Sequence, residues 1–123
     1  MAEKKHILVV DDDVMSLRRA EFILKKTSHE ILTAESGDEC IQKLQSNQVD
    51  LLVLDVKMPG KDGLETLSEI RGMAGFEDLP VIFLTGTEDT EQMREAEALG
   101  AKDFAIKPLK PQELMDQIER ALE

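Results

Sequence analysis

Short apolar runs recur along the chain, and four of them stop at a polar residue. The runs and the residues that end them are Val9-Val10 before Asp11-Asp12, Val53-Leu54 before Asp55, Phe83-Leu84 before Thr85, and Ala105-Ile106 before Lys107. If these runs are parallel strands of one sheet, their carboxyl ends lie along one rim, which is where open α/β sheets place ligands. Three carboxylates, a hydroxyl and an ammonium group would then meet at the same edge.

The spacing of apolar residues predicts five strands that alternate with five helices. Residues 6–10 and 51–54 are continuous apolar runs, a pattern typical of strands buried on both faces of a sheet. The other expected strands are 30–34, 81–84 and 104–106. The first and fourth helices are expected over 14–26 and 88–99. The second is expected to be capped by Ser36, the third to have an apolar stripe that starts at Leu64, and the fifth to begin at Pro111. This alternation favours a parallel, doubly wound α/β sheet with right-handed crossovers.

The order of the strands decides which polar residues meet. In the flavodoxin-like order 2-1-3-4-5, the first and third strands are neighbours at the topological switch point. Asp11, Asp12 and Asp55 would then share one crevice, with Thr85 and Lys107 beside it. We therefore expect a flavodoxin-like (βα)5 fold with helices on both faces of a five-stranded parallel sheet.

Composition and charge exclude several classes of protein. The 123 residues carry 26 acidic side chains against 15 lysines and arginines, and this formal charge of −11 repels nucleic-acid backbones and anionic membrane surfaces. No apolar run approaches the roughly 20 residues that span a bilayer. The single cysteine, Cys40, excludes an internal disulfide and suggests a reducing compartment. We expect one domain over residues 1–123, in the cytoplasm, with no direct contact to nucleic acid or membrane.

The acidic residues at the predicted rim need a counter-ion. Two carboxylates about 4 Å apart repel by roughly 1 kcal/mol in water and by about 4 kcal/mol at an effective dielectric constant of 20. Lys107 supplies one positive charge. A hard divalent cation with oxygen ligands is expected to supply the rest, and we predict Mg²⁺, or Mn²⁺ in its place.

Asp55 is the best candidate for a nucleophile at this rim. It follows the run 51–54 and precedes a loop with the turn signals Pro59-Gly60 and Asp62-Gly63, so we expect an exposed carboxylate on a rigid backbone. A carboxylate beside a metal ion and an ammonium group can accept a phosphoryl group as an acyl phosphate, because both cations neutralise charge on the transferring oxygens. The residues therefore favour phosphoryl transfer to Asp55.

In these residues and their order, the chain resembles the receiver domains of response regulators in two-component signalling, including the chemotaxis regulators. The resemblance extends from about residue 5 through the last helix. It implies that Asp55 is the phosphoacceptor, that Asp12, Asp55 and the backbone carbonyl of Lys57 bind the metal, and that Asp11 assists through metal-bound water. Asp13 lies one place beyond this motif and is expected to be a solvated surface acid.

The same resemblance implies a switch. Thr85 would hydrogen-bond a phosphoryl oxygen, Lys107 would pair with the phosphoryl group, and Phe104 would be the aromatic residue whose rotamer changes with the state. The bond between Lys107 and Pro108 is expected to be cis. Phe104 lacks the hydroxyl group of the tyrosine that is common at this position, so it cannot make that polar contact when it turns inward.

Two further positions are predicted to set how long the phosphoryl group survives. Lys57 is a long cation where the family often has smaller or polar residues, and Thr87 lies two residues after Thr85. We hypothesise that Lys57 and Thr87 tune the lifetime of the acyl phosphate.

The function that the resemblance implies is a phosphorylation-activated signalling switch. A sensor histidine kinase or a histidine phosphotransfer protein would donate the phosphoryl group, docking on the first helix near Val14, Met15 and Leu17. The fourth helix, fifth strand and fifth helix would then change their surface and control a downstream protein or effector domain. Beyond its own phosphorylation and autodephosphorylation, no enzymatic activity is expected. We expect a monomer, with a phosphorylation-dependent dimer as the alternative.

Rival functions have weaker support. A phosphohydrolase of the haloacid-dehalogenase type would need an Asp-x-Asp motif, and Lys57 occupies the second position of that motif. A nucleotide-binding protein would need a glycine-rich loop after the first strand, where the sequence has Asp11-Asp12-Asp13 instead. The alternative that stays open is a receiver-like interaction module that is not phosphorylated. His6 and His29 are expected at the surface or at strand edges.

Overall fold

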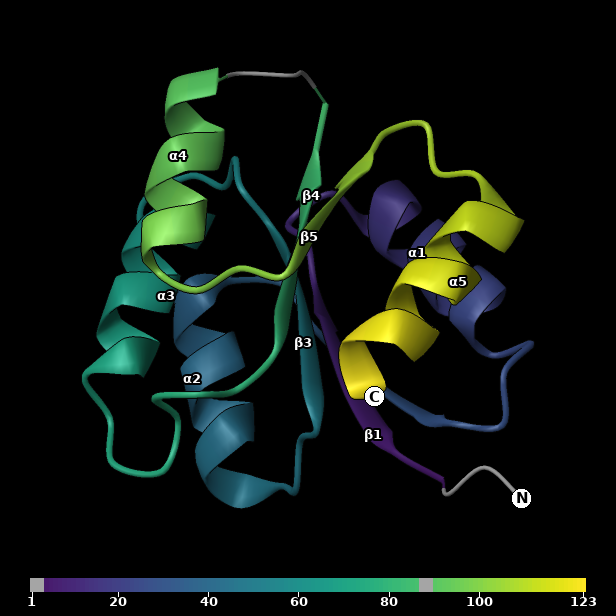
Figure 1. Cartoon of the computed structure of the whole chain (residues 1–123), viewed down its shortest axis with the longest axis horizontal. Helices are drawn as coiled ribbons and strands as arrows, with labels where there is room; N and C mark the ends of the chain where they lie inside the picture. Colours follow the sequence, from purple (N-terminus) through teal and green to yellow (C-terminus); the bar gives the residue numbers. More distant parts are fainter. Residues whose placement is uncertain (1–3, 87–89) are drawn as a thin grey trace.

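The computed structural model describes residues 4–86 and 90–123, which form a parallel sheet between two layers of helices (Figure 1). The elements are β1 (His6–Val10), α1 (Val14–Leu24), β2 (Glu30–Ala34), α2 (Gly37–Ser46), β3 (Leu51–Asp55), α3 (Gly63–Arg71), β4 (Val81–Thr85), α4 (Thr90–Ala98), β5 (Asp103–Ile106) and α5 (Pro111–Leu122). The strand order is β2-β1-β3-β4-β5, so the predicted flavodoxin-like topology is confirmed.

The two faces of the sheet carry separate apolar cores. Helices α1 and α5 cover one face, and α2, α3 and α4 cover the other, as Figure 1 shows. The three central strands are almost completely enclosed, and the four residues Ile7–Val10 of β1 have no exposed surface. These strands appear in the sequence as continuous apolar runs because the side chains on both faces of each strand are buried.

The register of the sheet brings the polar residues at the strand ends to one level. Val10 of β1 pairs with Leu54 of β3, so the residues that follow them, Asp11 and Asp55, lie side by side. Asp55 in turn pairs with Leu84 of β4, the residue before Thr85. A parallel sheet with this register therefore assembles the site from three neighbouring strands.

Polar side chains fix where several helices begin. Asp13 accepts a hydrogen bond from the backbone N–H of Met15 and caps α1, and Ser36 caps α2 in the same way. Asp62 and Glu65 form a reciprocal capping box at the start of α3. Asp13 is exposed, as expected of a surface acid, but its role as a helix cap was not predicted.

Two helices differ from the expected ranges. Helix α1 ends at Leu24 rather than at residue 26, because the N–H of Lys26 bonds back to the carbonyl of Ile23 and tightens the chain into a turn. For the fourth helix, expected over 88–99, residues 88 and 89 lie outside the described residues, and the described helix is Thr90–Ala98. The other elements agree with their predicted positions to within one residue.

His29 directly precedes the edge strand β2 but is buried, which corrects the expectation that it lies at the surface. Only 3% of its side chain is exposed. Its Nδ1 accepts a hydrogen bond from the backbone N–H of Lys5 at 3.0 Å, so the proton of the neutral ring lies on Nε2, 2.8 Å from a carboxylate oxygen of Glu119 in α5. The ring thus joins the chain just before β1 to the last helix, which is why a polar residue is buried there.

Helix α4 is the least enclosed helix, and its anchor lies near its carboxyl end. Ala96 is its only fully buried residue. Just beyond the helix, the carbonyl of Leu99 accepts a hydrogen bond from the guanidinium of Arg71 in α3, at 2.7 Å. The same guanidinium also donates to the carbonyls of Phe76 and Leu79, so one side chain joins three segments on this side of the sheet. None of the helices in the described part of the chain is both long and apolar enough to span a bilayer.

Candidate functional site

Three carboxylates meet at the carboxyl ends of β1 and β3. Asp11, Asp12 and Asp55 each offer an oxygen atom, and these oxygens all lie within 4.8 Å of one another. Asp11 has no exposed surface and Asp55 is 5% exposed, whereas Asp12 is exposed. The cluster is therefore a buried pair of carboxylates with one solvent-facing carboxylate at its mouth. Asp55 is more enclosed than expected, because β3 lies at the centre of the sheet.

Lys107 reaches this cluster from the end of β5. Its Nζ lies 2.8 Å from Oδ2 of Asp11 and 3.5 Å from Oδ2 of Asp55. Its backbone N–H donates to the carbonyl of Thr85 at 2.8 Å, which fixes the start of the side chain against β4. Burial lowers the pKa of Lys107, but the hydrogen bond to Asp11 and the charges of both carboxylates outweigh burial and leave the pKa above its ordinary value. The side chain is therefore a cation at neutral pH.

Burial and a like charge dominate the environment of Asp55. Burial, followed by the neighbouring carboxyl of Asp11, raises the pKa of Asp55 to about 7, although Lys107 opposes this change. One ammonium group is thus insufficient to hold both buried carboxylates fully ionised at neutral pH. A second cation at the cluster would favour the ionised form of Asp55.

The donor set fits a hard divalent cation. All three ligand groups are carboxylates, the type that Mg²⁺ and Mn²⁺ prefer, and neither histidine nor cysteine belongs to the cluster. The exposed side of Asp12 leaves access for water and for a phosphoryl group. Asp11, Asp12 and Asp55 could therefore hold the metal ion that the sequence predicts.

The loop between β3 and α3 carries the other predicted ligand. Lys57 has an exposed side chain, and it lies between Val56 and Met58, which are 4% and 8% exposed. These two apolar neighbours anchor the backbone on both sides of the Lys57 carbonyl. The side chain of Lys57 is exposed to solvent.

The predicted switch residues lie on β4 and β5. Thr85 is the last residue of β4 and is 6% exposed. Phe104 is half-buried, and its ring stacks on that of Phe83, with the centroids 6.5 Å apart and the planes at 18°. The bond between Lys107 and Pro108 is cis, as predicted. Thr87, the second predicted tuning residue, lies outside the described residues.

Two residues with polar contacts between elements, Gln117 and Lys61, were not predicted to be functional. Gln117 of α5 is buried, and its Nε2 donates to the backbone carbonyl of Phe104 at 2.8 Å. Lys61, in the loop after Asp55, makes ion pairs with both α2 and α3. A polar residue on the apolar stripe of α5 was a usable signal for Gln117, but the sequence has no comparable signal for Lys61.

The first helix presents a partly apolar outer surface. Met15 and Phe22 are 75% and 66% exposed, and Val14 is 43% exposed. Leu17, near which docking is expected, is 6% exposed and belongs to the core between the sheet and α5, so its own side chain contributes little to this surface. Its side chain turns inward because the apolar stripe of an amphipathic helix faces the sheet.

Comparisons with known proteins agree with this geometry. The family model of the response regulator receiver domain matches residues 7–119. Among solved structures, the chemotaxis protein CheY4 of Vibrio cholerae superposes with a TM-score of 0.92 at 28% identity, covering 98% of this chain and 100% of that chain. A putative response regulator from Chloroflexus aurantiacus superposes with a TM-score of 0.91 at 32% identity, covering 98% of each chain.

Curated relatives include longer regulators. A probable transcriptional regulator, ycf27, of Cyanophora paradoxa is 38% identical over 97% of this chain and 48% of its own length. The alkaline phosphatase synthesis transcriptional regulatory protein PhoP of Bacillus subtilis is 30% identical over 96% of this chain and 48% of its own length. The chain thus spans about half the length of these relatives. Taken with the strand order and the acidic cluster, these matches show that the chain belongs to the family of response regulator receiver domains, whose members act in phosphorylation-based signalling.

Proposed function

We propose that this chain is a signalling switch that accepts a phosphoryl group on Asp55 in a reaction that depends on Mg²⁺. The observation that carries the proposal is the position of the Lys107 ammonium group, which lies within 4 Å of both buried carboxylates at the carboxyl ends of β1 and β3. Receiver domains typically bind Mg²⁺ and work with histidine kinases or phosphotransfer proteins. Here Asp11, Asp12 and Asp55, with the backbone carbonyl of Lys57, are the proposed metal site.

The proposed reaction forms one bond and breaks another. A carboxylate oxygen of Asp55 bonds to phosphorus while the N–P bond of a phosphohistidine on the donor breaks, and the released imidazole takes a proton from solvent. When bound, the metal ion neutralises charge on the transferring oxygens. Lys107 pairs with the incoming phosphoryl group. Its contacts with Asp11 at 2.8 Å and with Asp55 at 3.5 Å support this role, because they hold the ammonium group beside the nucleophile.

Phosphorylation is proposed to act through Thr85 and Phe104. The Thr85 hydroxyl would bond a phosphoryl oxygen, and the Phe104 ring would repack toward the space that Thr85 leaves. The half-buried position of Phe104 against Phe83 supports this movement. The surface formed by α4, β5 and α5 would thereby change and control a partner protein or an effector domain.

The phosphodonor is proposed to be a sensor histidine kinase or a histidine phosphotransfer protein that docks on α1. The exposed side chains of Met15 and Phe22 support this, since they give an otherwise acidic domain a local apolar contact surface. We further propose that residues 1–123 form one receiver domain, that it acts in the cytoplasm as a monomer, and that it dimerises, if at all, after phosphorylation. Apart from phosphorylating and dephosphorylating itself, the domain is proposed to have no enzymatic activity.

Incubation with Mg²⁺ and acetyl phosphate tests the proposal. Intact-protein mass spectrometry should detect the addition of one phosphoryl group, and the addition should be lost without Mg²⁺ and in the Asp55→Asn variant. Asp13→Asn is the matched control, since Asp13 is an exposed acid that caps α1, and it should still be phosphorylated. If neither acetyl phosphate nor a panel of purified histidine kinases adds a phosphoryl group, the chain is instead a receiver-like interaction module.

The same experiment tests the proposed tuning residues. After acetyl phosphate is removed, the decay of the phosphorylated mass gives the lifetime of the acyl phosphate. We propose that Lys57→Ala and Thr87→Ala change this lifetime, and lifetimes equal to that of the parent would contradict the proposal. For Lys57, support comes from an exposed side chain on the loop that carries the proposed carbonyl ligand.

A further inference from the structure

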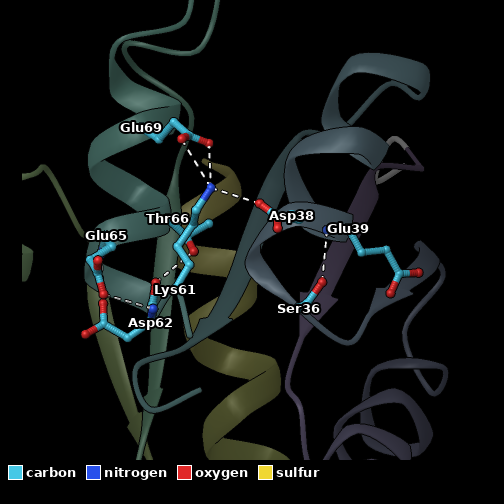
Figure 2. Close-up of polar contacts among 8 residues, drawn as sticks. All are labelled: Ser36, Asp38, Glu39, Lys61, Asp62, Glu65, Thr66 and Glu69. Atoms are coloured by element: carbon cyan, nitrogen blue, oxygen red, sulfur yellow. Dashed lines mark hydrogen bonds and ion pairs between the residues drawn. The ribbon is translucent and has the colours of Figure 1, made fainter. Parts of the chain in front are cut away.

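Lys61 connects the loop after Asp55 to two helices (Figure 2). Its Nζ lies 2.9 Å from a carboxylate oxygen of Asp38, in the first turn of α2, and 3.0 and 3.2 Å from the two carboxylate oxygens of Glu69, in α3. The hydrogen bonds to Asp38 and Glu69 raise the pKa of Lys61 above its ordinary value. One side chain thus links α2, α3 and the loop that precedes α3.

The loop from Val56 to Asp62 is closed at its base. The N–H of Gly63 donates to the carbonyl of Val56 at 2.8 Å, and the N–H of Val56 donates to Leu84 of β4 at 3.0 Å. A Cβ at residue 63 would overlap the carbonyl oxygen of Asp55, so only glycine allows α3 to begin this close to the end of β3. The loop therefore leaves the sheet and returns to it at nearly the same point, with Lys57 near its beginning and Lys61 near its end.

The starts of α2 and α3 lie unusually close together. A Cβ at Gly37 would overlap the hydroxyl oxygen of Thr66 and would come within 3.2 Å of Cδ of Lys61. Thr66 in turn donates its hydroxyl to the carbonyl of Asp62 at 2.7 Å. The aliphatic part of Lys61 therefore lies beside the beginning of α2, and its ammonium group lies between the carboxylates of Asp38 and Glu69 (Figure 2).

We propose that Lys61 is a positioning residue for the metal site: by fastening the end of the closed loop to α2 and α3, it holds the Lys57 carbonyl where a divalent cation can use it. This inference rests on the proposed function, because it assumes that the site binds Mg²⁺. Lys61 itself does not touch the ion. Groups that orient a ligand from outside commonly change metal affinity by about tenfold or more when they are removed.

Electrostatics and positioning predict opposite effects of removing the Lys61 charge. The ammonium group repels Mg²⁺, and without it Asp38 and Glu69 become two uncompensated negative charges on α2 and α3. Simple electrostatics therefore predicts tighter binding of Mg²⁺ in Lys61→Met. Positioning predicts weaker binding, because the end of the loop is no longer fastened. The sign of the change decides between the two.

The experiment measures Mg²⁺ affinity directly, by isothermal titration calorimetry at fixed ionic strength, for the parent, Lys61→Met, Lys61→Arg and Lys25→Met. Methionine keeps the unbranched side chain of Lys61 without the charge, and arginine keeps the charge and both ion pairs. Lys25→Met is the matched control, because it removes a lysine from another ion pair, with Glu21 in α1 at 3.3 Å, that has no connection to the loop. We expect Lys61→Met to bind Mg²⁺ about tenfold more weakly and Lys61→Arg and Lys25→Met to bind like the parent.

A second readout is the amide chemical shift of Lys57 and Met58 during the Mg²⁺ titration, which in Lys61→Met should move less than in the parent at equal saturation. Circular dichroism verifies that each variant is folded. If Lys61→Met binds Mg²⁺ as tightly as the parent, or more tightly, Lys61 does not position the site and the inference is overturned. If the parent itself binds no Mg²⁺, it is the proposed function that fails.

Discussion

At the residue scale, the burial of Asp55 makes the stability of the domain depend on pH. In the folded protein the pKa of Asp55 is about 7, against 3.8 for an unperturbed carboxyl. At a pH below both values the carboxyl is protonated in the folded and the unfolded state, so folding buries no charge at this position. As the pH rises between them, the unfolded state ionises first, so the free energy of unfolding falls. Above about pH 7 the loss is complete.

We predict that this dependence disappears in Asp55→Asn. In metal-free buffer, the free energy of unfolding of Asp55→Asn minus that of the parent should increase by up to about 1.4 kcal/mol per pH unit between the two pKa values. It should level off above about pH 7. Urea unfolding followed by circular dichroism measures the difference, since the chain has neither tryptophan nor tyrosine as a fluorescence probe. A difference that is constant with pH would contradict the raised pKa.

At the element scale, Gln117 joins the last helix to the edge strand of the sheet. Strand β5 pairs with β4 on one side only, and the carbonyl of Phe104 is satisfied by the buried amide of Gln117 in α5. Leaving a buried carbonyl without a donor costs about 1–3 kcal/mol. The position of Phe104 therefore depends on α5 as well as on the sheet.

We predict that Gln117→Leu lowers the free energy of unfolding by about 1–3 kcal/mol, because the substitution leaves the partly buried Phe104 carbonyl without the donor from Gln117. Gln112→Leu is the control on the same helix: Gln112 is exposed and bonds only to Asp116, one turn later, among the described residues. Its substitution should change the free energy of unfolding by less than about 0.5 kcal/mol. Equal effects of the two substitutions in urea unfolding would show that the buried hydrogen bond contributes nothing.

At the scale of the whole molecule, the net charge of −11 responds to any salt, whereas the acidic cluster responds to a cation that binds to it. Any salt screens the general repulsion between surface carboxylates, because screening acts over a Debye length of about 10 Å at 0.1 M. A bound Mg²⁺ acts only through its own site. A ligand that binds the folded state at 100 times its dissociation constant stabilises it by about 2.7 kcal/mol.

We therefore predict that Mg²⁺ at 100 times its dissociation constant raises the free energy of unfolding by about 2.7 kcal/mol beyond the effect of NaCl at equal ionic strength. Asp12→Asn should lose this extra stabilisation while keeping the response to NaCl, since it removes the solvent-facing carboxylate and leaves Lys107 paired with Asp11. Urea unfolding in the two salts measures both effects. Equal stabilisation of the parent by the two salts would argue against a specific metal site.

Much of this architecture follows from the sequence, because it depends on local patterns. Continuous apolar runs identify the central strands, and a polar residue at the end of each run identifies Asp11, Asp55, Thr85 and Lys107 without knowledge of the strand register. Parallel strands bring such residues together whatever the lengths of the intervening helices. The predicted cluster therefore assembles as expected.

Contacts between helices were beyond this kind of prediction. The burial of His29 requires Glu119 in α5 to approach from 90 residues away, and the role of Lys61 requires two helix starts to meet over Gly37. Neither follows from the periodicity of a single element, because the relative placement of two helices depends on side-chain packing across the whole layer. The enclosure of Asp55 was missed for the same reason, since covering a strand end requires its neighbours to be in place.

The anchoring of α4 has a consequence for how a signal could cross this side of the domain. Because Ala96 and the bond from Arg71 to the Leu99 carbonyl both lie toward the carboxyl end of the helix, that end is held more firmly than the amino end. If α4 moves, its amino end is expected to move farther than its carboxyl end. A partner that binds α4 near Thr90 would therefore be more sensitive to such a movement than one that binds near Ala98.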